Sequence, residues 1–469
     1  MSDIYFTNTL SKKKELFKPT KEGQVGIYSC GPTVYWDQHI GHMYAYVQWD
    51  TLVRFLRLMN YKVTWVMNIT DVGHMTSDED TGEDKMEKGA KREGISVWDL
   101  ADKYIEQFED SMKLLNITTP DKLPRVTENI DDQIELIKII KENGFTYQTN
   151  MGVVYDTSKF PDYAKFANLN LEKQQQIKDL EVDDEKKEPW DFLLWITGNK
   201  KHIMKWKSPW GEGYPGWHIE CTAMSTKYLG ESFDIHTGGR EHIGIHHTNE
   251  IAQGHAAFGK HTANIWLHNA WLTGKKGEKM SKSLGNYVTA QSLVEKGYDP
   301  IALRYLILNS HYSKGLKFSF EALDSAQNAL KNIYQLLSGY RNDKRRTTIS
   351  SEKEKKVDGF RNKFTSALSD DLNTPQALAV FWEMMKSNIP SEDKYDLALM
   401  FDEVLGLRMK ENSTKVEINI PKEITALLDK REEFRKSKDF KKADEVRDQI
   451  EKEGYTLLDL DGGTKVTKS

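Results

Sequence analysis

The sequence predicts an α/β fold in which a Rossmann-like parallel sheet is followed by an all-α region. Apolar, β-branched runs alternate with helical patterns near the start of the chain, and the same alternation returns from about residue 216. After about residue 298, strand patterns largely disappear. A chain of 469 residues is also long enough to bury the cores of about three domains.

The first group of elements is a strand, a helix and a second strand. Residues 24–30, QVGIYSC, form an apolar run, and residues 39–61 place apolar side chains at helical spacing. Residues 62–70, KVTWVMNIT, form a second run rich in β-branched side chains. In parallel sheets, ligands bind beyond the carboxyl ends of the strands. Cys30 and Thr70 are therefore expected at the ligand-binding edge.

An insertion interrupts this alternation. Residues 123–201 contain helical pieces and a charged stretch instead. The α/β pattern resumes in residues 216–230, 232–239, 246–259 and 263–273, so the same sheet is expected to continue there. The rest of the chain is mainly amphipathic and helical, in residues 301–310, 319–340, 360–387 and 424–454.

The composition excludes several classes of protein. A formal net charge of −5 and a pI near 6.3 do not suit a protein that coats nucleic acid by bulk charge, so an RNA partner would need local basic patches. Two cysteines cannot form a disulfide framework for a chain of this size. They suit a reducing compartment, which favours a cytosolic protein. No stretch approaches the ~18 apolar residues of a membrane span.

The tetrapeptide His39-Ile40-Gly41-His42 opens a helix directly after a strand. Backbone N–H groups and the positive end of the helix dipole make such a position a natural anion site, and two imidazoles add donors for a phosphate. The alternative is a chance match in which one histidine belongs to the core.

A lysine-rich loop, residues 274–286, follows a strand pattern. Its segment Lys279-Met280-Ser281-Lys282-Ser283 carries two ammonium groups and two hydroxyls between glycines. Such a loop could close on a polyphosphate and stabilise the charge that develops on it. The alternative is a solvated, charged loop.

A third group of residues suits a metal ion. Thiols, an imidazole and a carboxylate form a plausible tetrahedral zinc set, supplied by Cys30, Cys221, His246 and Glu250. His246 and Glu250 are four residues apart on a predicted helix and so share a face. His247 is a competing ligand, and either cysteine could instead be a small buried hydrophobe. An aromatic loop, residues 209–221, leads into Cys221 and is most simply interpreted as packed aromatic side chains.

Taken together, these residues resemble the class I aminoacyl-tRNA synthetases, and within them the cysteinyl-tRNA synthetases. Residues 39–42 and 279–283 look like the two class signatures, in the right order and separated by an insertion. Four further segments are similar to segments of the cysteine enzymes: YSCGPTVY (28–35), GWHIEC (216–221), HHTNEIAQ (246–253) and DDLNTPQAL (370–378). The resemblance spans nearly the whole chain.

The resemblance implies how the amino acid is recognised. One zinc ion per chain would be bound by Cys30, Cys221, His246 and Glu250. This zinc would accept the substrate thiolate, which allows strong rejection of serine because a thiolate is a soft ligand and forms far more readily than an alkoxide. Residues that look like the cysteine pocket are Gly31, Thr70, Trp217 and His236, with Trp217 as the floor.

The same resemblance implies the reaction. The carboxylate of L-cysteine would attack ATP, with magnesium, to give cysteinyl-adenylate, and the amino acid would then esterify the terminal ribose of tRNA(Cys). ATP-binding residues would be His39, Gly41, His42 and Lys282. Catalysis would depend on His39, His42, Lys279 and Lys282. A monomer is expected.

The resemblance also divides the chain. The catalytic domain would comprise residues 1–122 and 202–297 around a connective region, 123–201, and would be followed by linking helices, 298–317, an anticodon-binding helical domain, 318–410, and a small C-terminal anticodon module, 418–469. Polar residues of that module would be Arg431, Arg435, Lys438, Asp439, Asp444 and Arg447. The chain departs from the family pattern at residues 73–90, which look like a local insertion, and at Glu241, where the family often has Asp.

Two other interpretations remain open. The cysteine ligases of mycothiol synthesis share both signatures and the zinc set, but they join cysteine to an amino sugar and lack a full anticodon region. A zinc-dependent RNA-binding protein without catalysis would not need a polyphosphate site. The helical back third and the two intact signatures favour the synthetase.

Overall fold

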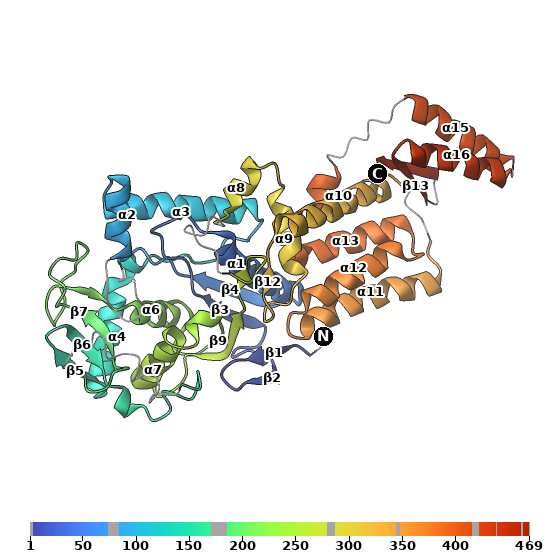
Figure 1. The fold of residues 1–469 in the computed structure, drawn as a ribbon. Coiled ribbons are helices and arrows are strands. Elements are labelled where there is room, and N and C mark those ends of the chain that lie inside the picture. Colours follow the sequence, from blue (N-terminus) through green and yellow to red (C-terminus); the bar gives the residue numbers. More distant parts are fainter. Residues whose placement is uncertain are drawn as a thin grey trace. The chain divides into compact units, whose positions relative to one another are not determined.

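The computed structural model describes residues 3–73, 84–169, 185–278, 287–343, 348–414, 422–437, 439–460 and 463–468 (Figure 1). The chain divides into two compact units. The first unit comprises Met1–Pro300, Ser310–Ser319 and Ser369–Leu372, and the second comprises Ile301–Asn309, Phe320–Leu368 and Asn373–Ser469. The finer division into six parts stays a prediction.

A parallel four-stranded sheet forms the centre of the first unit, with the strand order β10-β9-β3-β4. Its strands are β3 (Gln24–Ser29), β4 (Lys62–Met67), β9 (Phe233–Gly239) and β10 (Ala263–Asn269). The predicted parallel sheet, resumed after an insertion, is therefore confirmed. Because β4 lies on one side of β3 and β9 on the other, the strand order reverses at β3, and this is where such sheets bind ligands.

Helices cover this sheet. They are α1 (Ile40–Leu58), α6 (Trp217–Leu229) and α7 (His246–Phe258), as the spacing of apolar residues predicts. Helix α1 packs on β4 and β9, and α6 packs on β3, β4 and α7 (Figure 1). All seven residues of β9 are buried, which is typical of a strand covered on both faces. Smaller elements of the same unit are β1 (Tyr5–Asn8), β2 (Lys13–Leu16), α2 (Lys85–Glu93), α3 (Val97–Leu114), β11 (Leu272–Thr273), α8 (Ala290–Glu295) and β12 (Leu316–Lys317).

A second sheet, which the sequence analysis did not predict, takes three strands from the insertion and a fourth from residues that follow it. Helix α4 (Ile130–Glu142) matches the expected helical piece. Antiparallel strands follow, in the order β5-β6-β7-β8: β5 (Thr146–Thr149), β6 (Gly152–Tyr155), β7 (Phe192–Ile196) and β8 (Tyr214–Pro215). These strands are short, and 36 residues separate β6 from β7 in the sequence, so no alternating pattern long enough to recognise develops.

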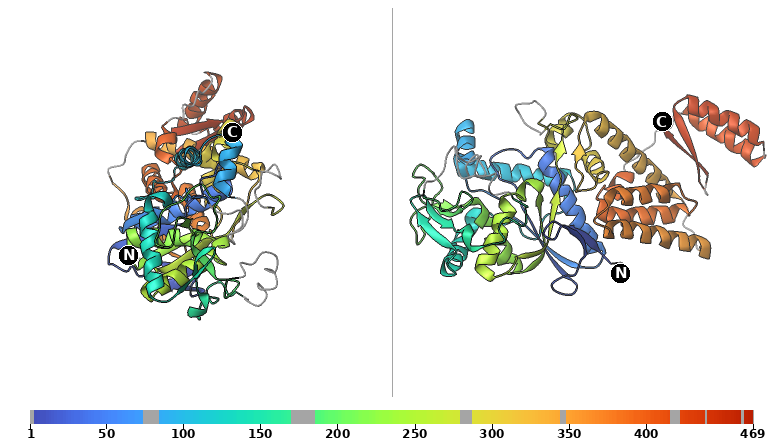
Figure 2. Two further views of the ribbon diagram at one scale, coloured as in Figure 1. Left: turned by 90° about the vertical axis from the view of Figure 1, so that its left-hand side faces the viewer. Right: turned by 60° about the horizontal axis from the view of Figure 1, so that its bottom comes forward.

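The second unit is mainly helical, as predicted (Figure 2). Its helices are α9 (Pro300–Leu308), α10 (Phe320–Asn342), α11 (Ser351–Ser369), α12 (Thr374–Lys386), α13 (Ser391–Leu405), α14 (Met409–Ser413), α15 (Lys422–Lys436) and α16 (Phe440–Lys452). The chain ends in an antiparallel hairpin, β13 (Tyr455–Leu460) with β14 (Gly463–Lys468), which the sequence analysis missed. Among the described helices, none combines the length and the apolar composition that crossing a membrane requires.

Two glycines of the second unit should respond oppositely to an added methyl group. Gly406 ends α13 with φ 63°. A Cβ there would lie 2.7 Å from the guanidinium of buried Arg304, whose Nε donates to Leu405 O. Gly406→Ala should lower the free energy of unfolding by about 1–2 kcal/mol or more. Gly359 lies inside α11, and no described atom stands within 4 Å of an added Cβ. Gly359→Ala should therefore stabilise by up to about 1 kcal/mol. Urea unfolding followed by circular dichroism measures both changes, and equal shifts in one direction would contradict this account.

Candidate active site and metal-binding residues

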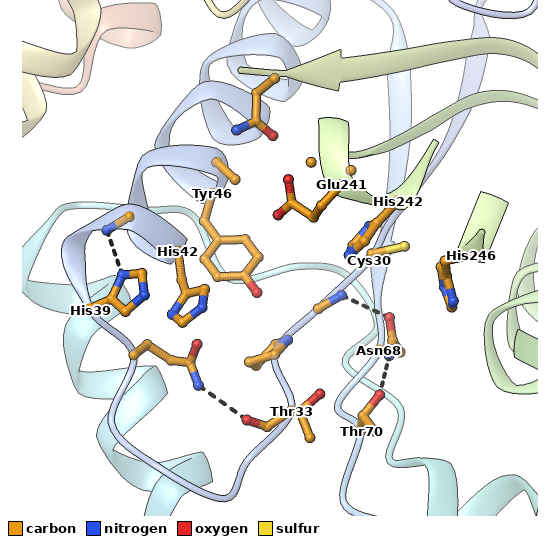
Figure 3. Close-up of a pocket in the computed structure, with 18 of the residues that line it drawn as sticks. Cys30, Thr33, His39, His42, Tyr46, Asn68, Thr70, Glu241, His242 and His246 are labelled. Atoms are coloured by element: carbon orange, nitrogen blue, oxygen red, sulfur yellow. Dashed lines mark hydrogen bonds between the residues drawn. The ribbon is translucent and has the colours of Figure 1, made fainter. Parts of the chain in front are cut away.

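A cavity of about 640 Å³ lies at the carboxyl ends of the parallel strands (Figure 3). Every strand of the central sheet ends at this cavity. Cys30 follows β3, Asn68 follows β4, Gly239 ends β9 and Asn269 ends β10, and all four line the cavity. The cavity therefore lies at the edge of the sheet that was predicted to bind ligands.

His39 and His42 form one wall of the cavity. His39 caps α1, because its Nδ1 accepts a hydrogen bond from the backbone N–H of Gly41 at 3.0 Å. This bond makes Nε2 the protonated nitrogen of a neutral ring. The two imidazole rings are stacked, with centroids 3.8 Å apart. A Cβ on Gly41 would lie 2.7 Å from the His39 ring, so a side chain here would displace the ring that caps the helix. The helix end and the two rings together suit a phosphate.

A buried cluster of metal-ligating side chains lies on another wall. Ligand atoms of Cys30, His246, His247 and Glu250 all lie within 4.8 Å of one another. His246 Nε2 is 3.1 Å from Glu250 Oε1, and the Cys30 thiol is 3.2 Å from His247 Nε2. Helix α7 supplies the imidazoles and the carboxylate, and the end of β3 supplies the thiol. The tertiary fold thus brings together three of the four predicted zinc ligands.

The electrostatics of this cluster suit a divalent cation. Burial alone raises the pKa of the Cys30 thiol, but side-chain hydrogen bonds, above all the one from Cys221, lower it well below its ordinary value. Burial also raises the pKa of Glu250, yet the nearby His236 and His246 rings lower it to about 2. Burial lowers the pKa of His247 to about 4, so this ring is neutral. Burial lowers the pKa of His246, but the Glu250 carboxylate raises it to about 10, so a cation would have to displace a proton from this ring. Thiolate, carboxylate and deprotonated imidazole are the donors that zinc prefers.

Cys221, the fourth predicted ligand, lies beside the cluster of four. It is 2% exposed, and its Sγ is 3.8 Å from Asn68 Oδ1. The hydrogen bond to Cys30, and then burial, raise the pKa of the Cys221 thiol well above its ordinary value. His247 takes the fourth place within the cluster, and its Nδ1 is held 2.7 Å from His268 Nε2. A partner on the second ring nitrogen is typical of metal-binding histidines. The choice between Cys221 and His247 therefore stays open.

The predicted amino-acid pocket residues divide into two groups. Gly31, Thr70 and Trp217 line the cavity. The Trp217 ring packs against His246, with centroids 4.6 Å apart. His236 is fully buried and holds Glu250, with its Nε2 2.9 Å from Oε2.

The two signature lysines of the 279–283 segment lie outside the described residues. The sequence analysis did not single out several other residues that line the cavity, among them Asn68, His242 and Trp271. Asn68 could have been predicted from the sequence, because it lies two residues before Thr70 at the end of the same predicted strand. The other two come to the cavity through tertiary folding.

A second group of metal-ligating residues, Asp84, Glu87 and His202, does not suit a metal ion. His202 Nδ1 accepts from the backbone N–H of Met204 at 3.1 Å, so Nε2 carries the proton. That N–H faces Asp84 Oδ2 at 2.9 Å and the Gly73 carbonyl at 3.1 Å. The ring therefore lacks a lone pair for a cation and instead ties two segments of the unit together.

Gly31 should be intolerant of any side chain. A Cβ there would lie 1.7 Å from the backbone oxygen of Asn68, so β3 and β4 would have to separate at the cavity. Gly31→Ala is expected to lower the free energy of unfolding by about 3 kcal/mol. Gly244→Ala is the matched control, because no described atom lies within 4 Å of a Cβ at that position. Thermal and urea unfolding compare the two variants, and equal stability would refute the close approach.

Known protein families match most of the chain. The family described as "tRNA synthetases class I (C) catalytic domain" matches residues 16–328, and the DALR domain matches residues 363–388. A cysteine--tRNA ligase of Treponema denticola is 42% identical over 97% of this chain and 98% of its own length. Cysteine--tRNA ligase 1 of Burkholderia lata is 43% identical over 98% of this chain and 96% of its own.

A solved structure is similar in fold. Methionyl-tRNA synthetase of Mycobacterium tuberculosis, bound by methionyl-adenylate, aligns with a TM-score of 0.58 over 83% of this chain and 90% of that one. The two sequences are 16% identical. This likeness confirms the predicted fold class: a Rossmann-like sheet followed by a helical region.

Proposed function

The chain belongs to the cysteine--tRNA ligase family of the class I aminoacyl-tRNA synthetases, and from this premise we propose that its cavity activates L-cysteine with ATP and transfers it to tRNA(Cys). One observation carries the proposal. Cys30 and His246, two members of the buried cluster, line the same cavity as the stacked imidazoles at the start of α1. The first site suits a thiol-selective metal, and the second suits a polyphosphate.

The residues of the chain position ATP for attack. The N-terminus of α1, with the N–H groups of the His39 and His42 rings, would hold its phosphates. The cysteine carboxylate then attacks the α-phosphorus in line, and pyrophosphate leaves. The cysteinyl-adenylate formed passes its aminoacyl group to a ribose hydroxyl of tRNA(Cys). Lys279 and Lys282 are proposed to stabilise charge during the first step, and the magnesium that accompanies ATP supplies neutralisation of the phosphates.

Zinc fits the donors at the thiol end of the cavity. Cys30, His246 and Glu250 would hold it, with Cys221 as the proposed fourth ligand and His247 as the rival. When bound, zinc supplies a soft Lewis acid that favours a substrate thiolate over a serine hydroxyl. Trp217 packs on His246 and so closes the cavity beside the metal ligands. Serine cannot form the metal–sulfur bond, so its binding would leave the metal without that ligand. A metal site therefore distinguishes cysteine from serine better than apolar contacts alone would.

The helical region supports tRNA as the acceptor. Both relatives match this chain over nearly their whole lengths, and the DALR match falls on α11 and α12 of the second unit. An amino-sugar ligase would not need this region, and a non-catalytic RNA-binding protein would not need the phosphate site of α1. The enzyme is proposed to act in the cytosol as a monomer.

The activity itself gives the first test. Purified protein with cysteine, ATP and magnesium should exchange labelled pyrophosphate into ATP, and serine should support far less exchange because it cannot supply a thiolate. A tRNA(Cys) transcript should then be charged, whereas an amino-sugar acceptor should not receive cysteine. Absence of cysteine-dependent exchange would refute the proposed function. Exchange followed by transfer to the amino sugar alone would select the other ligase.

The metal ligands give the second test. Cys30→Ser and Cys221→Ser should each lower zinc affinity at least about 10–100-fold, and His247→Gln should retain zinc if that ring is not a ligand. Bound zinc is measured by mass spectrometry after dialysis against a competing chelator. In the cobalt-substituted protein, two thiolate ligands should give about twice the sulfur-to-cobalt charge-transfer absorption of Cys221→Ser. Metal loss in His247→Gln, with retention in Cys221→Ser, would assign the fourth position to His247.

A further inference from the structure

The segment DDLNTPQAL, residues 370–378, resembles a segment of the cysteine enzymes but stands outside the described lining of the cavity. It forms the turn between α11 and α12 and the first part of α12. Asp371 and Leu372 have φ values of 62° and 52°, which residues other than glycine seldom adopt. Such a conformation persists only where surrounding contacts hold it, and it is common at functional positions. The contacts of this turn therefore indicate what it does.

Asp371 joins two segments that are distant in the sequence, and all three belong to the first unit. Its Oδ1 accepts hydrogen bonds from the N–H of Thr7 at 2.8 Å and from the hydroxyl of Tyr312 at 2.7 Å. Its Oδ2 accepts from the hydroxyl of Thr7 at 2.5 Å. Burial, and then the Asp371 carboxylate, raise the pKa of Tyr312 well above its ordinary value, so this hydroxyl stays protonated and donates. The carboxylate thus fixes the position of the Tyr312 side chain.

Tyr312 lies directly behind a wall of the cavity. Its ring is 2% exposed and packs against Trp49, with centroids 5.8 Å apart, and Trp49 lines the cavity. Its carbonyl accepts from the N–H of Ala270 at 2.8 Å. Ala270 stands in the chain between Asn269 and Trp271, which both line the cavity. Tyr312 therefore supports the wall both with its ring and with its backbone.

The next residue, Ser313, supports the loop that follows β9. Its carbonyl accepts from Arg240 Nη2 at 2.6 Å. Arg240 stands in the chain between Gly239 and Glu241, which both line the cavity. Residues 312–313 thus hold the chain just after β9 and just after β10, so a shift of this short segment would move two parts of the wall together. The proposed metal ligands come from other elements, namely the end of β3, α6 and α7.

We propose that Asp371 is a positioning residue for the cavity and that it acts through Tyr312. This inference rests on the proposed activation of cysteine by ATP. A misplacement of about 1 Å can cost about 100-fold in rate, so a residue that fixes the wall from behind affects the reaction without touching a substrate. The second half of the segment has a different role. The Asn373 side chain accepts from the N–H of Gln376 at 3.1 Å and so caps the start of α12.

Removing the carboxylate should slow catalysis and leave the metal in place. Asp371→Ala should lower kcat for cysteine-dependent pyrophosphate exchange about tenfold or more, because Tyr312 and the wall it supports would no longer be held. Bound zinc should stay at the wild-type level. Asp371→Asn should retain most of kcat, since its amide oxygen can accept from Thr7 and Tyr312. Asp370→Asn is the matched control, because this neighbouring carboxylate has a side chain that is 59% exposed and contacts Lys14.

The two partners of the carboxylate separate positioning from a purely structural role. Tyr312→Phe removes only the donor hydroxyl. It should lower kcat severalfold, with little further loss when it is combined with Asp371→Ala, because both changes break the same contact. Thr7→Val removes the other hydroxyl and is expected to lower the melting temperature while leaving kcat unchanged. Circular dichroism and thermal unfolding show whether each variant is folded at the assay temperature.

The remaining outcomes would overturn the inference or the function on which it rests. An unchanged kcat in folded Asp371→Ala would overturn the inference. Equal losses of kcat in Tyr312→Phe and Thr7→Val would also overturn it, because the carboxylate would then only stabilise the fold. This comparison decides alone if Asp371→Ala does not fold. Full additivity of Asp371→Ala and Tyr312→Phe would overturn the path through Tyr312. Absence of exchange in the wild-type enzyme would refute the proposed function instead.

Discussion

The site depends on the way β3 is held between its two parallel neighbours. The N–H of Cys30 donates to the Thr237 carbonyl of β9 at 3.1 Å, and the N–H of Gly31 donates to Asn68 Oδ1 beyond β4 at 2.9 Å. The thiol therefore projects from a backbone fixed on both sides. Helix α7 follows the neighbouring strand β9 in the chain. The side of α7 that carries the imidazoles and the carboxylate therefore faces the Cys30 thiol. The fold provides a rigid support for chemistry carried by a few side chains.

The buried charges at this point are compensated locally. Glu250 is completely buried, and it faces His236 at 2.9 Å and His246 at 3.1 Å. Removing a carboxylate from water is costly, and such a pair seldom stabilises a protein more than apolar packing would. Its presence is therefore better explained by function. The thiol and the carboxylate are already oriented, so a cation would bind with little movement of these donors and would displace the proton held on His246.

The sequence predicted correctly those features that depend on residues close together in the chain. The strand, helix and strand around Cys30 follow from residue periodicity, and the 39–42 signature follows from its place at a strand-to-helix turn. Contacts between distant segments were a different matter. His247 was recognised as a competitor only because it adjoins His246, and nothing in the spacing shows that its ring faces the Cys30 thiol. The antiparallel sheet of the insertion was missed because its strands are too short to display a period, and Trp271 reaches the cavity only through tertiary folding.

The two ends of the cavity differ in exposure, and the difference matches what each must do. Glu250 is 0% exposed and Cys221 is 2% exposed at the thiol end, whereas Trp271, which also lines the cavity, is 56% exposed. Selecting an amino acid by a single atom requires a dry, fixed set of donors, because electrostatic differences are large only where water is excluded. The substrates and products proposed for this enzyme must enter and leave the cavity in each turnover, and its exposed side allows that exchange. A buried thiol site joined to an open part of the cavity thus combines selectivity with release.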